Sequence, residues 1–196
     1  MYPHIESIRV VHRQFEHIEY HNQRLNQTRE HFLGRKSDWD IRSLVALPDH
    51  LDEGVYKFRL VYDLDIRSYT CLPYTPKVVK KLRLLTCDQA NYAFKSEDRS
   101  LLDALHAQRG EADDVLLIKQ GCMTDTTYSN VAFLEGDQWF TPNTYLLNGT
   151  CRQRLLQTGV LQEAHITVEN VHRFSACRPI NAMLVFEETP FAELIW

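Results

Sequence analysis

A segment rich in proline and lysine, residues 73–81, separates two parts of the chain with different patterning, and this division constrains the fold most. Strand-length segments dominate the part before it, around one long helical stretch. After it, short apolar strands alternate with helical stretches. A chain of 196 residues is long enough for one domain or for two small ones, with a sizeable buried core. The pattern predicts an α+β protein with a small N-terminal lobe, residues 1–76, and a larger C-terminal lobe, residues 77–196.

Apolar spacing and turn residues predict the individual elements. In the first lobe we expect strands at 5–11, 55–62 and 66–72, a turn at 63–65, a helix at 18–33 that Gly34 ends, and a short helix at 41–46. In the second lobe we expect strands at 82–86, 115–118, 131–134, 138–140, 165–168 and 182–186, and helices at 101–109 and from Gly149 to about 158. Residues 121–130 are interpreted as a polar connection between two of these strands.

Charge and cysteine content exclude several classes of protein. The net charge of −4 argues against a nucleic-acid-binding scaffold, which normally shows a basic face. The five cysteines are odd in number, widely spaced and without a CxxC pair, which indicates reduced thiols and neither a disulfide frame nor a metal site. No charged-then-apolar leader opens the sequence, and no apolar run approaches the ~20 residues that span a bilayer. We therefore expect a cytoplasmic protein without membrane or nucleic-acid partners.

Three separated motifs resemble the class IV aminotransferase family. In the first, residues 123–137, an acidic residue follows threonine, a short polar stretch leads to Ser-Asn, and a strand and a turn follow; a Thr-Pro pair comes next at 141–142. The second, Leu-Asn-Gly-Thr-Cys-Arg-Gln at 147–153, is similar to the family's helix entry, in a version closer to aminodeoxychorismate lyases. The third is Glu-Tyr-His-Asn-Gln-Arg-Leu at 19–25, similar to the start of the family's first long helix. Their order and spacing match, and the resemblance covers the chain from about residue 5 onward.

This resemblance implies a fold, a cofactor and a class of reaction. The fold would be the two-lobed α+β fold type IV of pyridoxal-phosphate (PLP) enzymes, with a shortened N-terminal lobe, assembled as a homodimer. The substrate would be an amino acid or an amino-substituted carboxylate, and the enzyme either an aminotransferase or a lyase of the aminodeoxychorismate type. Asn148 and Gln153 favour the lyase branch. The alternative is a non-catalytic or degenerate family member that binds PLP, which the short N-terminal lobe would favour.

The resemblance also assigns roles to individual residues. Lys95, 30 residues before Asp125, matches the family's Schiff-base lysine in the larger lobe. Asp125 matches the acidic partner of the pyridine nitrogen, and Arg24 the helix arginine that binds phosphate. The remaining cofactor-binding candidates, placed by the same motifs and by a late loop, are Asn130, Gly149, Thr150, Cys151, Asn181 and Ala182. Arg59 and Tyr128 are candidates for substrate contact.

The chemistry of PLP explains these residue types. PLP acts as the electron sink, while the protein binds, orients and tunes it. A neutral lysine amine is needed to bind the cofactor, and the freed amine can then act as general base. A carboxylate keeps the pyridine nitrogen protonated, and a helix N-terminus with an arginine suits the phosphate.

Some residues depart from the family pattern or have a simpler interpretation. Aspartate stands at 125 for the usual glutamate, cysteine at 151 for the usual threonine, and Val-Tyr-Asp at 61–63 for an expected Thr-Arg-Gly. Read without the resemblance, Lys95 and Arg24 are solvated surface charges and Asp125 is a turn residue. Cys151 is interpreted as a small buried filler without a catalytic thiol.

Overall fold

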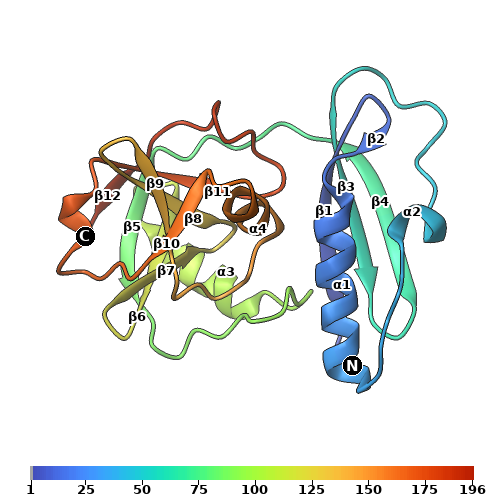
Figure 1. Ribbon diagram of the computed structural model, residues 1–196, viewed down its shortest axis with the longest axis horizontal. Coiled ribbons are helices and arrows are strands. Elements are labelled where there is room, and N and C mark those ends of the chain that lie inside the picture. Colours follow the sequence, from blue (N-terminus) through green and yellow to red (C-terminus); the bar gives the residue numbers. More distant parts are fainter. Residues whose placement is uncertain (1) are drawn as a thin grey trace. The chain divides into compact units, whose positions relative to one another are not determined.

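The computed structural model describes residues 2–196 (Figure 1). The chain folds into two compact units. The first unit runs to Pro76 and also contains Phe94–Asp98, and the second comprises Lys77–Ala93 and Arg99–Trp196. The segment with Lys95 therefore belongs with the first unit, although a division at the single linker 73–81 would put it in the larger C-terminal lobe. The reason is backbone pairing: the Ile5 amide donates to the Lys95 carbonyl at 2.9 Å, and the Glu97 amide donates to the Pro3 carbonyl at 2.9 Å.

The first unit is built on one antiparallel sheet with strand order β2-β1-β3-β4. Its strands are β1 (His4–Val11), β2 (Gln14–Phe15), β3 (Val55–Tyr62) and β4 (Ile66–Pro73). The three strands expected from the sequence are all present, and the turn at 63–65 is closed by a hydrogen bond from the Asp63 amide to the Asp65 carbonyl at 3.0 Å.

One long helix, α1 (Ile18–Leu33), covers the buried face of this sheet (Figure 1). Ile18 and Leu25 project from it into a core that includes Ile8 and Phe58. Gly34 ends the helix in the left-handed conformation, with φ of 65°, as its position predicts. The expected short helix is present as α2 (Ile41–Leu44).

The second unit contains two four-stranded sheets. The first sheet has the strand order β12-β5-β6-β7. Its strands are β5 (Lys81–Thr86), β6 (Asp114–Lys119), β7 (Cys122–Thr126) and β12 (Glu193–Ile195). The second sheet has the strand order β10-β9-β8-β11. Its strands are β8 (Asn130–Glu135), β9 (Gln138–Pro142), β10 (Leu161–Ala164) and β11 (Ala176–Ile180). The helices are α3 (Ser100–His106), followed by the 3₁₀ turn Ala107–Arg109, and α4 (Thr150–Gln157); a second 3₁₀ turn spans Val171–Arg173.

Alternation along β6 explains how the layers of this unit pack. Leu116 and Ile118 face the core shared with the second sheet, whereas Val115 and Leu117 face α3. The strand is buried on both faces, which is why it appears in the sequence as a continuous apolar run. Cys151 and Leu155 of α4 pack in the same way on the outer face of the second sheet. No helix among residues 2–196 is long and apolar enough to cross a membrane.

Three expectations about individual elements were wrong. Residues 121–130 are not a connection, because β7 lies within them; its polar side chains are buried and hydrogen-bonded, as for the Thr124 hydroxyl, which donates to the Leu117 carbonyl at 2.7 Å. Neither 165–168 nor 182–186 forms a strand. The strands lie earlier, in β10 and β11, and β11 tolerates Pro179 because it is the edge of its sheet.

Candidate functional site

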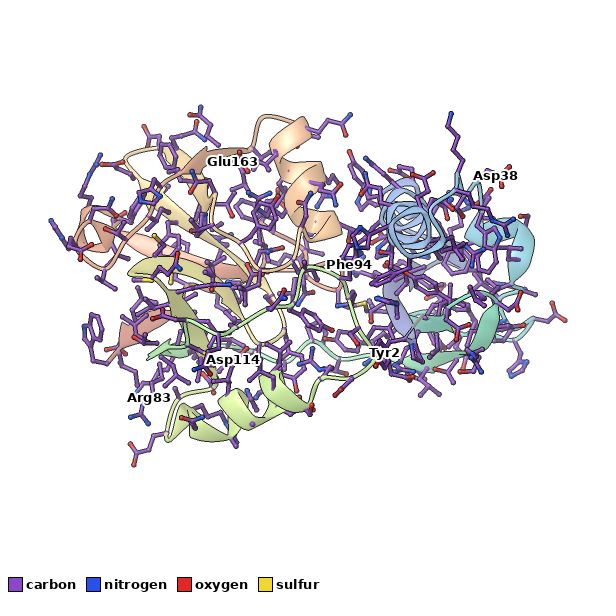
Figure 2. All side chains as sticks on the ribbon, turned by 90° about the horizontal axis from the view of Figure 1, so that it is seen from below. Tyr2, Asp38, Arg83, Phe94, Asp114 and Glu163 are labelled. Atoms are coloured by element: carbon purple, nitrogen blue, oxygen red, sulfur yellow. The ribbon has the colours of Figure 1, made fainter. Side chains whose placement is uncertain are left out.

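Lys95 is fixed to the first unit by the residues on either side of it. The Lys95 carbonyl accepts a hydrogen bond from the Ile5 amide. The ring of Phe94, the preceding residue (labelled in Figure 2), lies 4.5 Å from the His31 ring and 5.0 Å from the Phe32 ring of α1. Burial lowers the pKa of His21, and the charge of Lys95 contributes to that lowering. Lys95 therefore lies within electrostatic range of the inner face of α1.

Arg24 belongs to a buried polar network on that face. Its Nε and Nη2 donate to the two carboxylate oxygens of Glu6 at 2.9 and 2.5 Å, and His21 Nδ1 lies 2.6 Å from Glu6 Oε2. Burial opposes ionisation of Glu6, but Arg24 and His21 hold its pKa down at about 2. A charged Glu6–Arg24 pair with a neutral imidazole that donates from Nδ1 satisfies all these contacts. The guanidinium of Arg24 is thus held in one orientation by two parallel bonds.

Glu6 belongs to this network although none of the sequence motifs contains it. It lies in β1 and shares a strand face with Ile8 and Val10, which are both fully buried. A carboxylate on the buried face of a strand requires a charged partner. Period-two alternation could therefore have identified Glu6, and Arg24 on the covering helix is the partner it needed.

In the second unit, Asp125 is buried at the end of β7 and receives three hydrogen bonds from neutral groups. Asn130 Nδ2 donates to Oδ1 at 2.7 Å, and the amides of Leu146 and Leu147 donate to Oδ2 at 3.0 and 2.8 Å. Burial raises the pKa of the Asp125 carboxyl to about 6, although these hydrogen bonds act in the opposite direction. Oδ2 already accepts two hydrogen bonds, whereas Oδ1 accepts one and retains a lone pair for a further donor.

Gly149 lies where the backbone enters α4, against the side chain of Asn130. A Cβ added at Gly149 would lie 2.1 Å from Asn130 Oδ1, so no other residue fits without displacing Asn130. Asn130 Nδ2 bonds both Asp125 and the Leu147 carbonyl, the latter at 2.8 Å. The missing side chain at 149 therefore lets the first turn of α4 approach the Asp125–Asn130 pair closely. Thr150 and Cys151 form that first turn, where backbone N–H groups favour an anion.

The late loop reaches the same region. Asn181 Nδ2 donates to the Ser129 hydroxyl at 2.8 Å, and Asn181 Oδ1 accepts from the Met183 amide at 2.8 Å. Ala182 is half-buried in this loop. Cys151 is buried, and burial raises the pKa of its thiol, which agrees with its interpretation as a filler.

The structure thus brings the predicted residues together in two groups, one in each unit. Lys95 and Arg24 belong to the first unit, as does Arg59, which pairs at 2.8 Å with Glu97, two residues after Lys95. In the second unit, hydrogen bonds link Asp125, Asn130 and the entry to α4, while Asn181 bonds Ser129 next to Asn130. Tyr128 of this unit is 55% exposed.

Comparison with known proteins identifies the family. A family model for amino-transferase class IV matches residues 4–187. An uncharacterized protein of Haemophilus influenzae is 33% identical over 185 residues, which is 93% of this chain and 98% of that protein. The crystal structure of a "putative 4-amino-4-deoxychorismate lyase" from Haemophilus somnus is 32% identical with a TM-score of 0.86, over 93% of this chain and 97% of the other.

The same fold occurs in the PLP-bound form of a hypothetical aminotransferase from Mycobacterium tuberculosis, with a TM-score of 0.71 at 17% identity, over 93% of this chain and 78% of the other. The family model spans nearly the whole chain, including every residue of both groups. The protein belongs to the class IV aminotransferase family and has its fold type IV architecture.

Proposed function

We propose that the protein is a PLP-dependent enzyme that acts on an amino acid or an amino-substituted carboxylate. The observation that carries the proposal is the buried Asp125 carboxylate, which has only neutral hydrogen-bond donors and lies beside a glycine at the start of α4. A buried carboxylate of this kind is completed by a cationic partner, and a protonated pyridine ring supplies one.

The residues present fit the cofactor. Asp125 would hold the pyridine nitrogen in its protonated state, and the backbone at Gly149, Thr150 and Cys151 would bind the phosphate, with Asn130, Asn181 and Ala182 shaping this part of the site. Arg24, oriented by Glu6, would add a charge-assisted contact to the phosphate. When bound, PLP supplies the electron sink for bonds broken at the substrate's Cα.

Lys95 would bind the cofactor covalently and then move protons. With PLP bound, the neutral Nζ of Lys95 would be the general base that takes the proton from the substrate's Cα and holds it on Nζ. Arg59 and Tyr128 are proposed to contact the substrate. The lyase branch is supported by Asn148 and Gln153 and by the name of the relative from Haemophilus somnus. The aminotransferase branch is the second candidate.

We also infer a homodimer in the cytoplasm. The resemblance to the family implies the dimer, and two-fold assembly is the commonest arrangement of soluble oligomers. The five cysteines without a CxxC pair are the feature that supports a reducing compartment.

One experiment tests the proposal directly. The protein is incubated with PLP, reduced with borohydride and digested, and the pyridoxyl group is expected on Lys95 and to be lost in Lys95→Arg. Lys57→Arg, on the neighbouring strand β3, is the matched control and should keep the label. Label on another lysine, or no label, would contradict the assignment.

A panel of amino donors then separates the alternatives. The cofactor spectrum is followed with L- and D-amino acids, and the consumption of 4-amino-4-deoxychorismate is measured in parallel. A spectral change with an amino acid favours the aminotransferase, and consumption of the chorismate derivative favours the lyase. PLP on Lys95 with neither reaction would favour the non-catalytic alternative.

A further inference from the structure

Asp114, which none of the sequence motifs contains, is a buried carboxylate on which three donors converge. It begins β6, lies beside α3 (Figure 2) and is 3% exposed. Its Oδ1 accepts from the Thr127 hydroxyl at 2.5 Å and from the Val115 amide at 2.8 Å, and His106 Nδ1 lies 3.0 Å away. Thr127 follows β7 and His106 ends α3, so one oxygen atom connects three elements.

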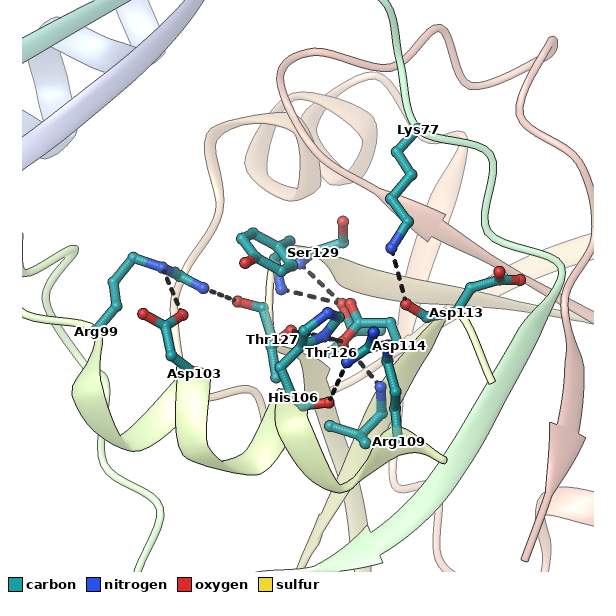
Figure 3. Close-up of polar contacts among 12 residues, drawn as sticks. Lys77, Arg99, Asp103, His106, Arg109, Asp113, Asp114, Thr126, Thr127 and Ser129 are labelled. Atoms are coloured by element: carbon teal, nitrogen blue, oxygen red, sulfur yellow. Dashed lines mark hydrogen bonds and ion pairs between the residues drawn. The ribbon is translucent and has the colours of Figure 1, made fainter. Parts of the chain in front are cut away.

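Both ends of α3 hold the same short segment (Figure 3). Arg99, just before the helix, donates from Nη2 to the Thr127 carbonyl at 2.9 Å, and its guanidinium carbon lies 4.4 Å from the centre of the Tyr128 ring. The His106 ring at the other end is nearly perpendicular to the Tyr128 ring, with their centres 5.5 Å apart. The helix therefore fixes Thr127 through hydrogen bonds and Tyr128 through ring contacts.

The segment held in this way is the turn that joins Asp125 to Asn130. The turn closes on itself, because the Thr126 amide donates to the Ser129 carbonyl at 2.8 Å and the Thr126 hydroxyl accepts from the Ser129 amide at 3.0 Å. Its two ends are joined by the bond from Asn130 to Asp125. Any displacement of the turn therefore moves the Asp125 carboxylate and the side chain that contacts Gly149.

We propose that Arg99, His106, Asp114 and Thr127, the Asp114 clamp, are positioning residues that set the orientation of Asp125 toward the cofactor. The inference rests on the proposed function. A turn that already closes through Thr126 does not need a second set of anchors for its own conformation. Asp114 is buried and well paired, so its network can hold the turn in one position. A fixed position for the adjacent Asp125 is the function that the connectivity supports.

Variants at Thr127 test the clamp. Thr127→Val removes the hydroxyl while keeping a β-branched side chain of similar size, and Thr127→Ser keeps the hydroxyl. Thr158→Val is the control, because that hydroxyl donates at 3.0 Å to the Arg154 carbonyl at the end of α4, outside the clamp. Thr127→Val loses a charge-assisted bond, so the amide hydrogen-exchange rates of residues 127–130 should rise about tenfold or more. The dissociation constant for PLP should increase about tenfold, and the visible absorption band of the bound cofactor should shift.

Thr127→Ser and Thr158→Val are expected to keep the wild-type values. Arg99→Gln loosens the same turn from the other end of α3 and should change exchange and PLP binding in the same direction, which provides a second test if Thr127→Val folds poorly. Faster exchange in Thr127→Val with wild-type PLP affinity and band would show that the clamp is only structural and would overturn the inference. Failure of the proposed function looks different, because the wild-type protein itself would then bind no PLP on Lys95.

Discussion

At Asp125, a buried carboxylate with neutral donors makes cofactor binding depend on pH. Burial raises its pKa to about 6, so the carboxyl is ionised above that pH and neutral below it. Only the ionised form can pair with a protonated pyridine nitrogen. PLP affinity should therefore fall as the pH is lowered through about 6, and this step should be absent in Asp125→Asn, which cannot ionise.

The measurement is the PLP dissociation constant between pH 5 and 8, followed by absorbance in both proteins. Asp137→Asn, in the exposed turn between β8 and β9, is the matched control and should keep the wild-type profile. Asp125→Asn also places an amide NH₂ against that of Asn130, so we expect a loss of stability on the order of 1–3 kcal/mol. A pH step that persists unchanged in Asp125→Asn would show that another group causes it.

The ionisation of Glu6 makes the stability of the first unit depend on pH in the acidic range. Its pKa is held at about 2 in the folded protein, well below the ordinary value of 4.5. A depressed carboxyl pKa contributes stability that is fully present above about 4.5 and is lost as the pH falls through about 2. A shift of this size corresponds to about 3 kcal/mol. Glu6→Gln should lack this contribution, so its deficit relative to wild type should be large at pH 7 and should shrink toward pH 2.

Urea unfolding at several pH values checks this, with Trp39 as a reporter of the first unit in a background in which Trp139 and Trp196 are phenylalanine. Glu16→Gln removes a carboxylate whose pair with Arg9 is more exposed and should cost little at any pH. An equal deficit for Glu6→Gln at pH 7 and pH 2.5 would contradict the role of its ionised form.

Among the elements, α1, β3 and β6 could be predicted from the sequence because apolar periodicity determines them. β7 could not, because its buried positions are polar and are satisfied by tertiary hydrogen bonds, such as the bond from the Thr124 hydroxyl to Leu117. The family motif nevertheless placed Asp125 and Gly149, which the structure connects through Asn130. The strand pattern marks Glu6 as buried but does not name its partners, and no local pattern indicates the Asp114 clamp, because its members lie on different elements.

The entry to α4 gives a test at the level of an element. In Gly149→Ala the new Cβ would lie 2.1 Å from Asn130 Oδ1, so Asn130 must move and its bonds to Asp125 and Leu147 are strained or lost. We expect a loss of about 1–3 kcal/mol in the free energy of unfolding, together with weaker PLP binding.

The double variant Gly149→Ala/Asn130→Ala isolates this contact. Asn130→Ala alone loses the same hydrogen bonds, and the added methyl group then has room, so the double variant should be no less stable than Asn130→Ala. Chemical denaturation of the wild type, the two single variants and the double variant measures the coupling energy between positions 130 and 149. Additive losses would mean that the methyl group at 149 meets an obstacle other than Asn130.

For the whole molecule, the division into units is not the one that a single linker predicts. Residues 94–98 return to the first unit, and pairing with β1 is a long-range contact that local composition does not encode. Lys95 and Arg24 consequently share one unit, and Asp125 and Gly149 share the other. The first unit runs to Pro76, and the separate segment with Lys95 also belongs to it.

The proposed homodimer gives the last prediction. Each unit exposes large apolar side chains, with Leu72 at 59% and Phe191 at 54%, and such groups commonly mark contacts with another chain when they gather in a patch. Sedimentation velocity of the PLP-loaded protein at micromolar concentration should give twice the 23.0 kDa mass of the chain. Because assembly depends on concentration, serial dilution should shift the profile toward monomer and reveal the dissociation constant. A single monomer species that keeps PLP on Lys95 at every concentration would show that the chain binds its cofactor without a partner.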